Sequence, residues 1–157
     1  MMQIYFLRHA DAEDMRTSDF ARVLTPKGLA QSEKVGKFCI RNGLLPEVIL
    51  SSPVVRADQT ARIVAKALGD VEVVVESWLA CGMAPDYCLE ELKTFAKWHS
   101  VMLVGHEPDF STTIAAMIGL RNADAVLIRK ASLTVVELDG FRAGAGRLQF
   151  SVPVRLM

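Results

Sequence analysis

Four side chains suited to phosphate chemistry lie next to predicted buried strands of this sequence. His9 follows the first apolar run with Arg8 directly before it, and His106 follows the last run before residue 108. Arg56 falls in the first turn of the helix after the second run. Arginine guanidinium groups match phosphate oxygens in pairs, and imidazoles serve as nucleophile, acid or base near neutral pH. The four residues therefore indicate chemistry on a phosphoryl group.

Apolar runs and capping signals place these residues within an alternating pattern of strands and helices. Buried strands are predicted at residues 3–8, 48–50, 71–75 and 101–104, and helices at 26–41, 55–68, 86–98 and 108–118. Thr25 and Asp86 are the expected N-caps of the first and third helices. Loops are expected at 9–23 and 77–85. The segment 125–154 is expected to hold two or three strands, with a turn at Asp139 and Gly140.

Strands that alternate with helices predict an α/β fold, here a three-layer α/β/α sandwich around a mainly parallel mixed sheet. The strand-rich tail predicts an antiparallel edge. The 157 residues fit a single domain, and no linker or repeat divides them. Ligands bind beyond the carboxyl ends of the strands in such sheets, so Arg8, His9, Arg56 and His106 are expected to converge on one edge.

Composition and charge argue against several classes of function. The formal net charge is zero, which is unlike a nucleic-acid or anionic-membrane binder. No apolar run approaches the ~20 residues that span a bilayer. No secretory leader is evident and the cysteine count is odd, so a cytoplasmic protein with reduced thiols is expected. Neither a metal nor a cofactor is predicted, because the acidic run after His9 is expected to be a solvated loop.

Three motifs resemble those of the histidine phosphatase superfamily, the phosphoglycerate-mutase-like proteins. Residues 7–10 are similar to its LRH signature, residues 51–61 to its SSPxxRAxQTA segment, and residues 104–108 to its GHxP element. Arg22 and the residues 24–28 resemble the RxLTxxG element of SixA-type phosphohistidine phosphatases, and residues 80–82 a short loop of that group. Together these matches extend over roughly two thirds of the chain, which implies the phosphoglycerate-mutase-like fold.

The resemblance implies a covalent mechanism that requires no metal ion. His9 would attack phosphorus and form a phosphohistidine intermediate, which water then hydrolyses. Arg8, Arg56 and His106 would hold the phosphoryl oxygens, and Arg22 is a candidate for a further contact. A backbone carbonyl or a carboxylate such as Asp11 would fix the tautomer of His9.

The proton donor stays open at this point. Glu107, Asp11 and Glu76 are candidates, and the loop that carries a glutamate in many superfamily members has none at residues 77–82. An imidazole leaving group, whose conjugate acid titrates near ~6.5, needs little help from an acid. We therefore expect a phosphohistidine phosphatase acting on a histidine-phosphotransfer type of protein. The alternatives are a phosphomonoesterase for a small metabolite and, less favoured, a binding module without turnover.

Overall fold

The computed structural model describes residues 1–14 and 18–157, so the part of the predicted first loop at 15–17 lies outside the described residues. The strands are β1 (Met2–Arg8), β2 (Val48–Ser51), β3 (Val73–Val75), β4 (Ser100–Gly105), β5 (Leu133–Leu138) and β6 (Gly146–Val152). The α-helices are α1 (Pro26–Arg41), α2 (Val55–Ala67), α3 (Pro85–Leu92) and α4 (Asp109–Met117). Short 3-10 turns lie at Ser77–Leu79, Lys93–Phe95, Ala123–Ala125 and Val154–Leu156.

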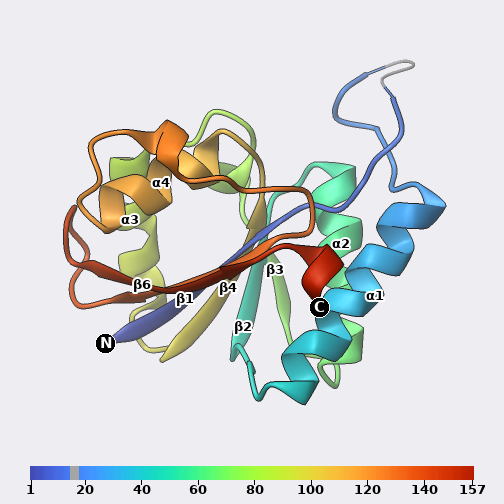
Figure 1. Cartoon of the computed structure of the whole chain (residues 1–157), viewed down its shortest axis with the longest axis horizontal. Helices are drawn as coiled ribbons and strands as arrows, with labels where there is room; N and C mark the ends of the chain where they lie inside the picture. Colours follow the sequence, from blue (N-terminus) through green and yellow to red (C-terminus); the bar gives the residue numbers. More distant parts are fainter. Residues whose placement is uncertain (15–17) are drawn as a thin grey trace.

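All six strands form one sheet in the order β3-β2-β4-β1-β5-β6. The first four are parallel, β5 runs antiparallel to β1, and β6 runs antiparallel to β5. Helices α1 and α2 cover one face, and α3 and α4 cover the other (Figure 1). The expected three-layer sandwich around a mainly parallel mixed sheet is confirmed.

Strand β1 shows why this sequence forms a central strand. Successive side chains point to opposite faces, and here both faces are covered. Ile4 and Phe6 are fully buried in the core under α3 and α4, whereas Tyr5 and Leu7 lie in the core under α1 and α2. Burial on both faces explains the nearly continuous apolar run. The run stops at Arg8, which is also where the strand ends.

The third helix differs from its prediction at both ends. It begins at Pro85 with Ala84 as N-cap, so the prediction of Asp86 as the cap was wrong. Proline fits the first helical position because it has no N–H to satisfy, and this moves the cap to the preceding residue. The α-helix ends at Leu92 instead of Trp98, and a tighter 3-10 turn follows over Lys93–Phe95.

The third strand is shorter than predicted and begins at Val73. The N–H groups of Asp70 and Val71 both donate to the carbonyl of Ala65, near the C-terminus of α2. These bonds hold both residues against the end of the helix. Asp70 has a left-handed φ of 64°, which turns the chain back toward the sheet. Of the residues that the apolar pattern assigned to the strand, Val71 therefore belongs to the closure of the helix.

The segment after residue 125 contains two strands, within the predicted two or three. They are connected by residues 139–145, and Gly140 in this connection has a φ of 114°, which only glycine adopts readily. Residues 126–132 form an irregular loop that lies against the end of β1, because the N–H of Ala131 donates to the carbonyls of Arg8 and His9. Among the described residues, every helix is too short or too polar to cross a membrane.

Candidate active site

The parallel strands end together and bring the predicted residues to one edge of the sheet. Arg8 pairs with Gly105 in the β1–β4 register. The ladder continues one residue further, because the N–H of His9 donates to the carbonyl of Gly105 at 3.0 Å. Ser52 at the end of β2 donates in the same way to Val104, also at 3.0 Å. The loops that carry the chemistry therefore begin at fixed points of the sheet.

His9 is held in one tautomer by a backbone carbonyl. Its Nδ1 lies 2.8 Å from the carbonyl oxygen of Ala10. A carbonyl only accepts hydrogen bonds, so Nδ1 carries the hydrogen and Nε2 keeps its lone pair. Arg56 Nε donates to this Nε2 at 3.3 Å. Of the two groups considered for this role, the carbonyl occupies the position, whereas the Asp11 carboxylate accepts from Thr25 and Lys130.

Both histidines of the site are neutral at physiological pH. His9 is 5% exposed and His106 is 2% exposed. Burial is the largest of the causes that lower the pKa of His9 to about 3; His106, Arg56 and Arg8 add to it, and the Ala10 carbonyl opposes it. Burial, with Arg56 and Arg8, lowers the pKa of His106 to about 4. A buried neutral imidazole whose Nε2 carries no hydrogen, as in His9, is a nitrogen nucleophile.

His106 lies beside His9, with 5.4 Å between the ring centroids. Its Nε2 is 2.8 Å from the hydroxyl oxygen of Ser52, and the N–H of Val54 donates to the same oxygen. Its Nδ1 is buried and has no hydrogen-bond partner among the described residues. Ser52 thus orients the ring and leaves one nitrogen for a ligand atom.

Arg8 and Arg56 supply the positive charge of the site. Arg8 donates from one terminal nitrogen to the carbonyl of Ile128 at 2.9 Å, while its Nε is buried with no partner in the part of the chain described. Burial lowers the pKa of Arg8, and the nearby Glu107 carboxylate opposes this effect. Unpaired buried donors are rare in native proteins, and an anion in the site would satisfy them.

Asp19 forms hydrogen bonds and an ion pair with Arg56. The Arg56 guanidinium donates to the Asp19 carbonyl at 2.9 Å and to its carboxylate at 3.2 Å. Arg22 donates to the other carboxylate oxygen at 3.0 Å and to the carbonyl of Glu13 at 2.6 Å. Arg22 is therefore linked to Arg56 by the Asp19 carboxylate that both residues contact. Sequence reasoning missed Asp19, because it lies in an irregular loop without a periodic signal.

The three candidates for the proton donor form no hydrogen bond to the imidazoles in the part of the chain that the structure describes. Glu107 accepts from the N–H of Ser111 at 2.7 Å, near the start of α4. Glu76 caps the 3-10 turn after β3. In the described ranges, no hydrogen bond links these carboxylates or that of Asp11 to His9, Arg56 or His106. The carboxylates of Glu107 and Asp11 thus have partners other than the imidazoles, and that of Glu76 makes no cap hydrogen bond to its turn.

Asp109 is a second residue that the sequence analysis missed. It is buried at the start of α4, and its carboxylate accepts from the N–H groups of Gly82 and Met83 at 2.9 and 3.2 Å. These bonds fix the loop that brings Cys81 Sγ to 3.9 Å from Arg56. Its position directly after the residue 104–108 motif was the signal that could have identified it. Across residues 1–14 and 18–157, no three His, Cys, Asp or Glu side chains are grouped as metal ligands.

The fold and the site together define an α/β protein with two imidazoles and two guanidinium groups at the carboxyl edge of its sheet. Residues 4–80 match the model of the histidine phosphatase superfamily (branch 1). The chain is 35% identical over 137 residues to a phosphohistidine phosphatase SixA homolog of Haemophilus influenzae, across 77% of this chain and 80% of the relative. The chain therefore belongs to the histidine phosphatase superfamily.

Solved structures share the fold over nearly the whole chain. A protein histidine phosphatase SixA complexed with tungstate aligns with a TM-score of 0.89 and 23% identity, over 99% of both chains. A phosphoserine phosphatase variant from Entamoeba histolytica, in complex with phosphoserine, aligns with a TM-score of 0.75 and 16% identity, over 99% of this chain and 98% of the other. The expected phosphoglycerate-mutase-like architecture is thereby confirmed.

Proposed function

We propose that this protein is a phosphatase that removes the phosphoryl group from phosphohistidine on a protein, through a covalent phospho-His9 intermediate. One observation carries the proposal. The Ala10 carbonyl holds the Nδ1 hydrogen of a neutral, buried His9, and this leaves Nε2 without a hydrogen, so that its lone pair accepts from Arg56 Nε. The similarity to the Haemophilus influenzae SixA homolog supports the choice of substrate.

The reaction proceeds in two displacements at phosphorus. In the first, His9 Nε2 forms a bond to phosphorus while the P–N bond of the substrate breaks, and the departing imidazole takes a proton from solvent. In the second, water attacks the phosphorus of phospho-His9, the Nε2–P bond breaks, and inorganic phosphate leaves. The proton from water goes to solvent or phosphate, and neutral His9 is restored. No step requires a metal ion.

The guanidinium groups and His106 offset the charge that develops on the phosphoryl oxygens. The phosphoryl group displaces the Asp19 carboxylate from Arg56 and accepts from the nitrogen atoms thus released. Arg8 Nε and His106 Nδ1, both buried without partners among the described residues, are the remaining contacts. Arg22 contributes indirectly, because it holds Asp19 when the site is empty.

The position of the carboxylates favours a P–N bond over a P–O bond. An alkoxide leaving group needs a positioned acid, which typically contributes about 10²- to 10⁴-fold. Glu107 and Asp11 are engaged by Ser111 and by Thr25 and Lys130. An imidazole leaving group titrates near ~6.5 and departs without such an acid.

A phosphomonoesterase for a small metabolite is the second candidate function. The proximity of the Glu107 carboxylate to Arg8 supports it, since an acid near the phosphate-binding groups is what an alkoxide leaving group needs. A binding module without turnover is the weakest candidate, because Arg8, His9, Arg56 and His106 are all present.

The test compares phosphate release from a phosphohistidine peptide, a phosphoserine peptide and an aryl phosphate, with wild type, His9→Asn and a control variant, His99→Asn. We expect wild type and the control to hydrolyse the phosphohistidine peptide fastest and His9→Asn to be inactive. Acid-labile phosphate should be trapped on wild type and be absent from His9→Asn. If only the monoesters are hydrolysed, the metabolite function replaces the proposal. Equal rates for His9→Asn and wild type would refute His9 as nucleophile.

A further inference from the structure

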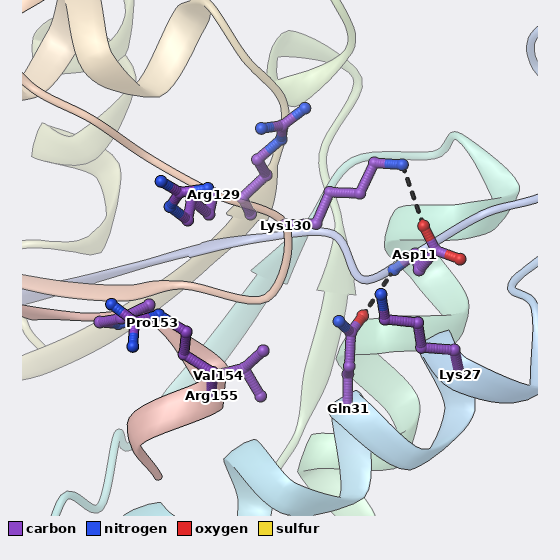
Figure 2. Close-up of a pocket in the computed structure, with 9 residues that line it drawn as sticks. Asp11, Lys27, Gln31, Arg129, Lys130, Pro153, Val154 and Arg155 are labelled. Atoms are coloured by element: carbon purple, nitrogen blue, oxygen red, sulfur yellow. Dashed lines mark hydrogen bonds and ion pairs between the residues drawn. The ribbon is translucent and has the colours of Figure 1, made fainter.

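A positively charged groove lies beside the proposed phosphoryl site. Its main cavity has a volume of about 420 Å³. The cavity is bounded by the first turns of α1, the loop before β5 and the C-terminal 3-10 turn, which lie close together although they are distant in sequence (Figure 2). We call it the basic groove, and its charged lining residues are Arg8, Lys27, Arg129, Lys130, Arg155 and the single acid Asp11.

The positive charge of the basic groove is largely unneutralised. Lys130 forms an ion pair with Asp11 at 3.0 Å. Lys27, Arg129 and Arg155 make no ion pair with any residue that the structure describes. The chain as a whole has zero net charge, so this concentration of cations is local. A surface of this kind attracts anionic groups.

The groove is fixed to the catalytic edge by the backbone. The N–H of Ala131 donates to the carbonyls of Arg8 and His9 at 3.1 and 3.2 Å, which fixes the loop that carries Arg129 and Lys130 to the backbone at the end of β1. Ala131 has a left-handed φ of 58°, a conformation that a residue with a Cβ adopts only at some cost. Groups next to the phosphoryl group on a substrate would therefore face the groove.

The groove also extends beyond its main cavity. A second cavity of about 290 Å³ adjoins the first and shares Arg129, Pro153 and Arg155 with it. This cavity extends to Leu127, which is 70% exposed. Two adjoining cavities that share Arg129 and Arg155, with the exposed apolar Leu127 lining the second, suit an extended chain better than one small anion.

We propose that the basic groove binds acidic side chains that flank the phosphohistidine of a protein substrate. This inference rests on the proposed function, and it adds the chemistry by which the protein would be recognised. Carboxylates of the substrate would pair with Arg129 and Arg155, while the phosphoryl group binds to Arg8 and Arg56. The groove would thus contribute to substrate binding and leave the chemical steps at His9 unchanged.

The test uses two phosphohistidine peptides that differ only in whether the flanking residues are glutamate or glutamine. The enzymes are wild type, the double variant Arg129→Gln with Arg155→Gln, and a control with the same loss of charge, Lys34→Gln with Lys37→Gln, on exposed positions of α1. For the glutamate peptide, we expect the groove variant to lose roughly 3- to 10-fold in kcat/KM through a higher KM, with salt reducing the difference. The glutamine peptide and an aryl phosphate should be unaffected.

A binding measurement separates the groove from the proposed activity. The unphosphorylated glutamate peptide is titrated against the same three proteins, and only the groove variant should bind it more weakly. If the peptide binds in this manner although phosphohistidine is not hydrolysed, the proposed function fails and the groove stands. If the groove variant and the control behave alike with both peptides, the inference is wrong. Competition by a small bisphosphate without any effect of glutamate would also overturn it, in favour of a metabolite.

Discussion

The two buried histidines predict a steep loss of stability on mild acidification. The pKa of His9 is lowered to about 3 and that of His106 to about 4. In the unfolded chain both titrate near ~6.5. Between these limits the unfolded state binds more protons than the folded state. The free energy of unfolding is therefore highest above about pH 6.5 and decreases as pH falls toward the folded pKa values.

The size of the effect follows from the number of protons taken up. Each histidine that binds a proton only on unfolding contributes up to about 1.4 kcal/mol per pH unit. Between pH 6 and pH 5 most unfolded imidazoles are already protonated, so the two groups together should lower the free energy of unfolding by about 2 kcal/mol. Asp11 and Asp19, whose pKa values are held below their usual range by hydrogen bonds to Thr25 and Arg22 respectively, act at lower pH.

Urea unfolding at several pH values between 5 and 8 measures this slope, with fluorescence of the buried Trp78 as the probe. His9→Asn keeps a donor near the Ala10 carbonyl, and His106→Gln keeps a polar group near Ser52. Each variant should lose about half of the slope, and the double variant nearly all of it. A free energy of unfolding that is constant from pH 7 to pH 5, or a slope that the variants leave intact, would refute the assignment of buried neutral histidines.

Two further predictions concern residues next to the site. Gly28→Ala would place a Cβ 2.0 Å from the Asp11 carbonyl oxygen, so we expect a loss of about 1–3 kcal/mol in urea unfolding. The exposed control Glu33→Ala should change stability by less than about 0.5 kcal/mol, and a similarly small effect of Gly28→Ala would contradict the contact. Asp19→Asn removes an ion pair in which the carboxylate is 53% exposed, worth about 0.2–1 kcal/mol, so tungstate should inhibit at about 1.4- to 5-fold lower concentration. Asp58→Asn is the matched control, and weaker inhibition of Asp19→Asn would instead mean that Asp19 holds Arg56 in place.

Much of the fold could be predicted from the sequence because its signals are local. The apolar runs that end at Arg8 and Gly105 mark strands buried on both faces, and parallel pairing then brings their ends to one edge. Thr25, with Pro26 after it, marks the start of α1, and its side chain accepts from the N–H of Gly28 as an N-cap should. The proximity of His9, Arg56 and His106 follows from this topology alone.

The contacts within the site depend on the paths of loops, which the sequence pattern does not fix. The Ala10 carbonyl, and not Asp11, holds His9, because the path of the loop after β1 places that carbonyl oxygen 2.8 Å from Nδ1. The contact between Asp19 and Arg56 joins positions 37 residues apart in the sequence, and no periodicity connects them.

The sequence by itself determined the order of the elements and the edge at which the imidazoles and guanidinium groups meet, since both follow from burial and from strand direction. Only the tertiary structure decided that the two imidazoles are neutral, that Arg56 is paired with Asp19, and that positive charge is concentrated in the basic groove. Lys27, Lys130 and Arg155 are far apart along the chain and line one groove because β5 returns antiparallel beside β1 and the C-terminal turn packs near α1 (Figure 1). Such long-range packing depends on all the intervening elements, so no local pattern encodes it.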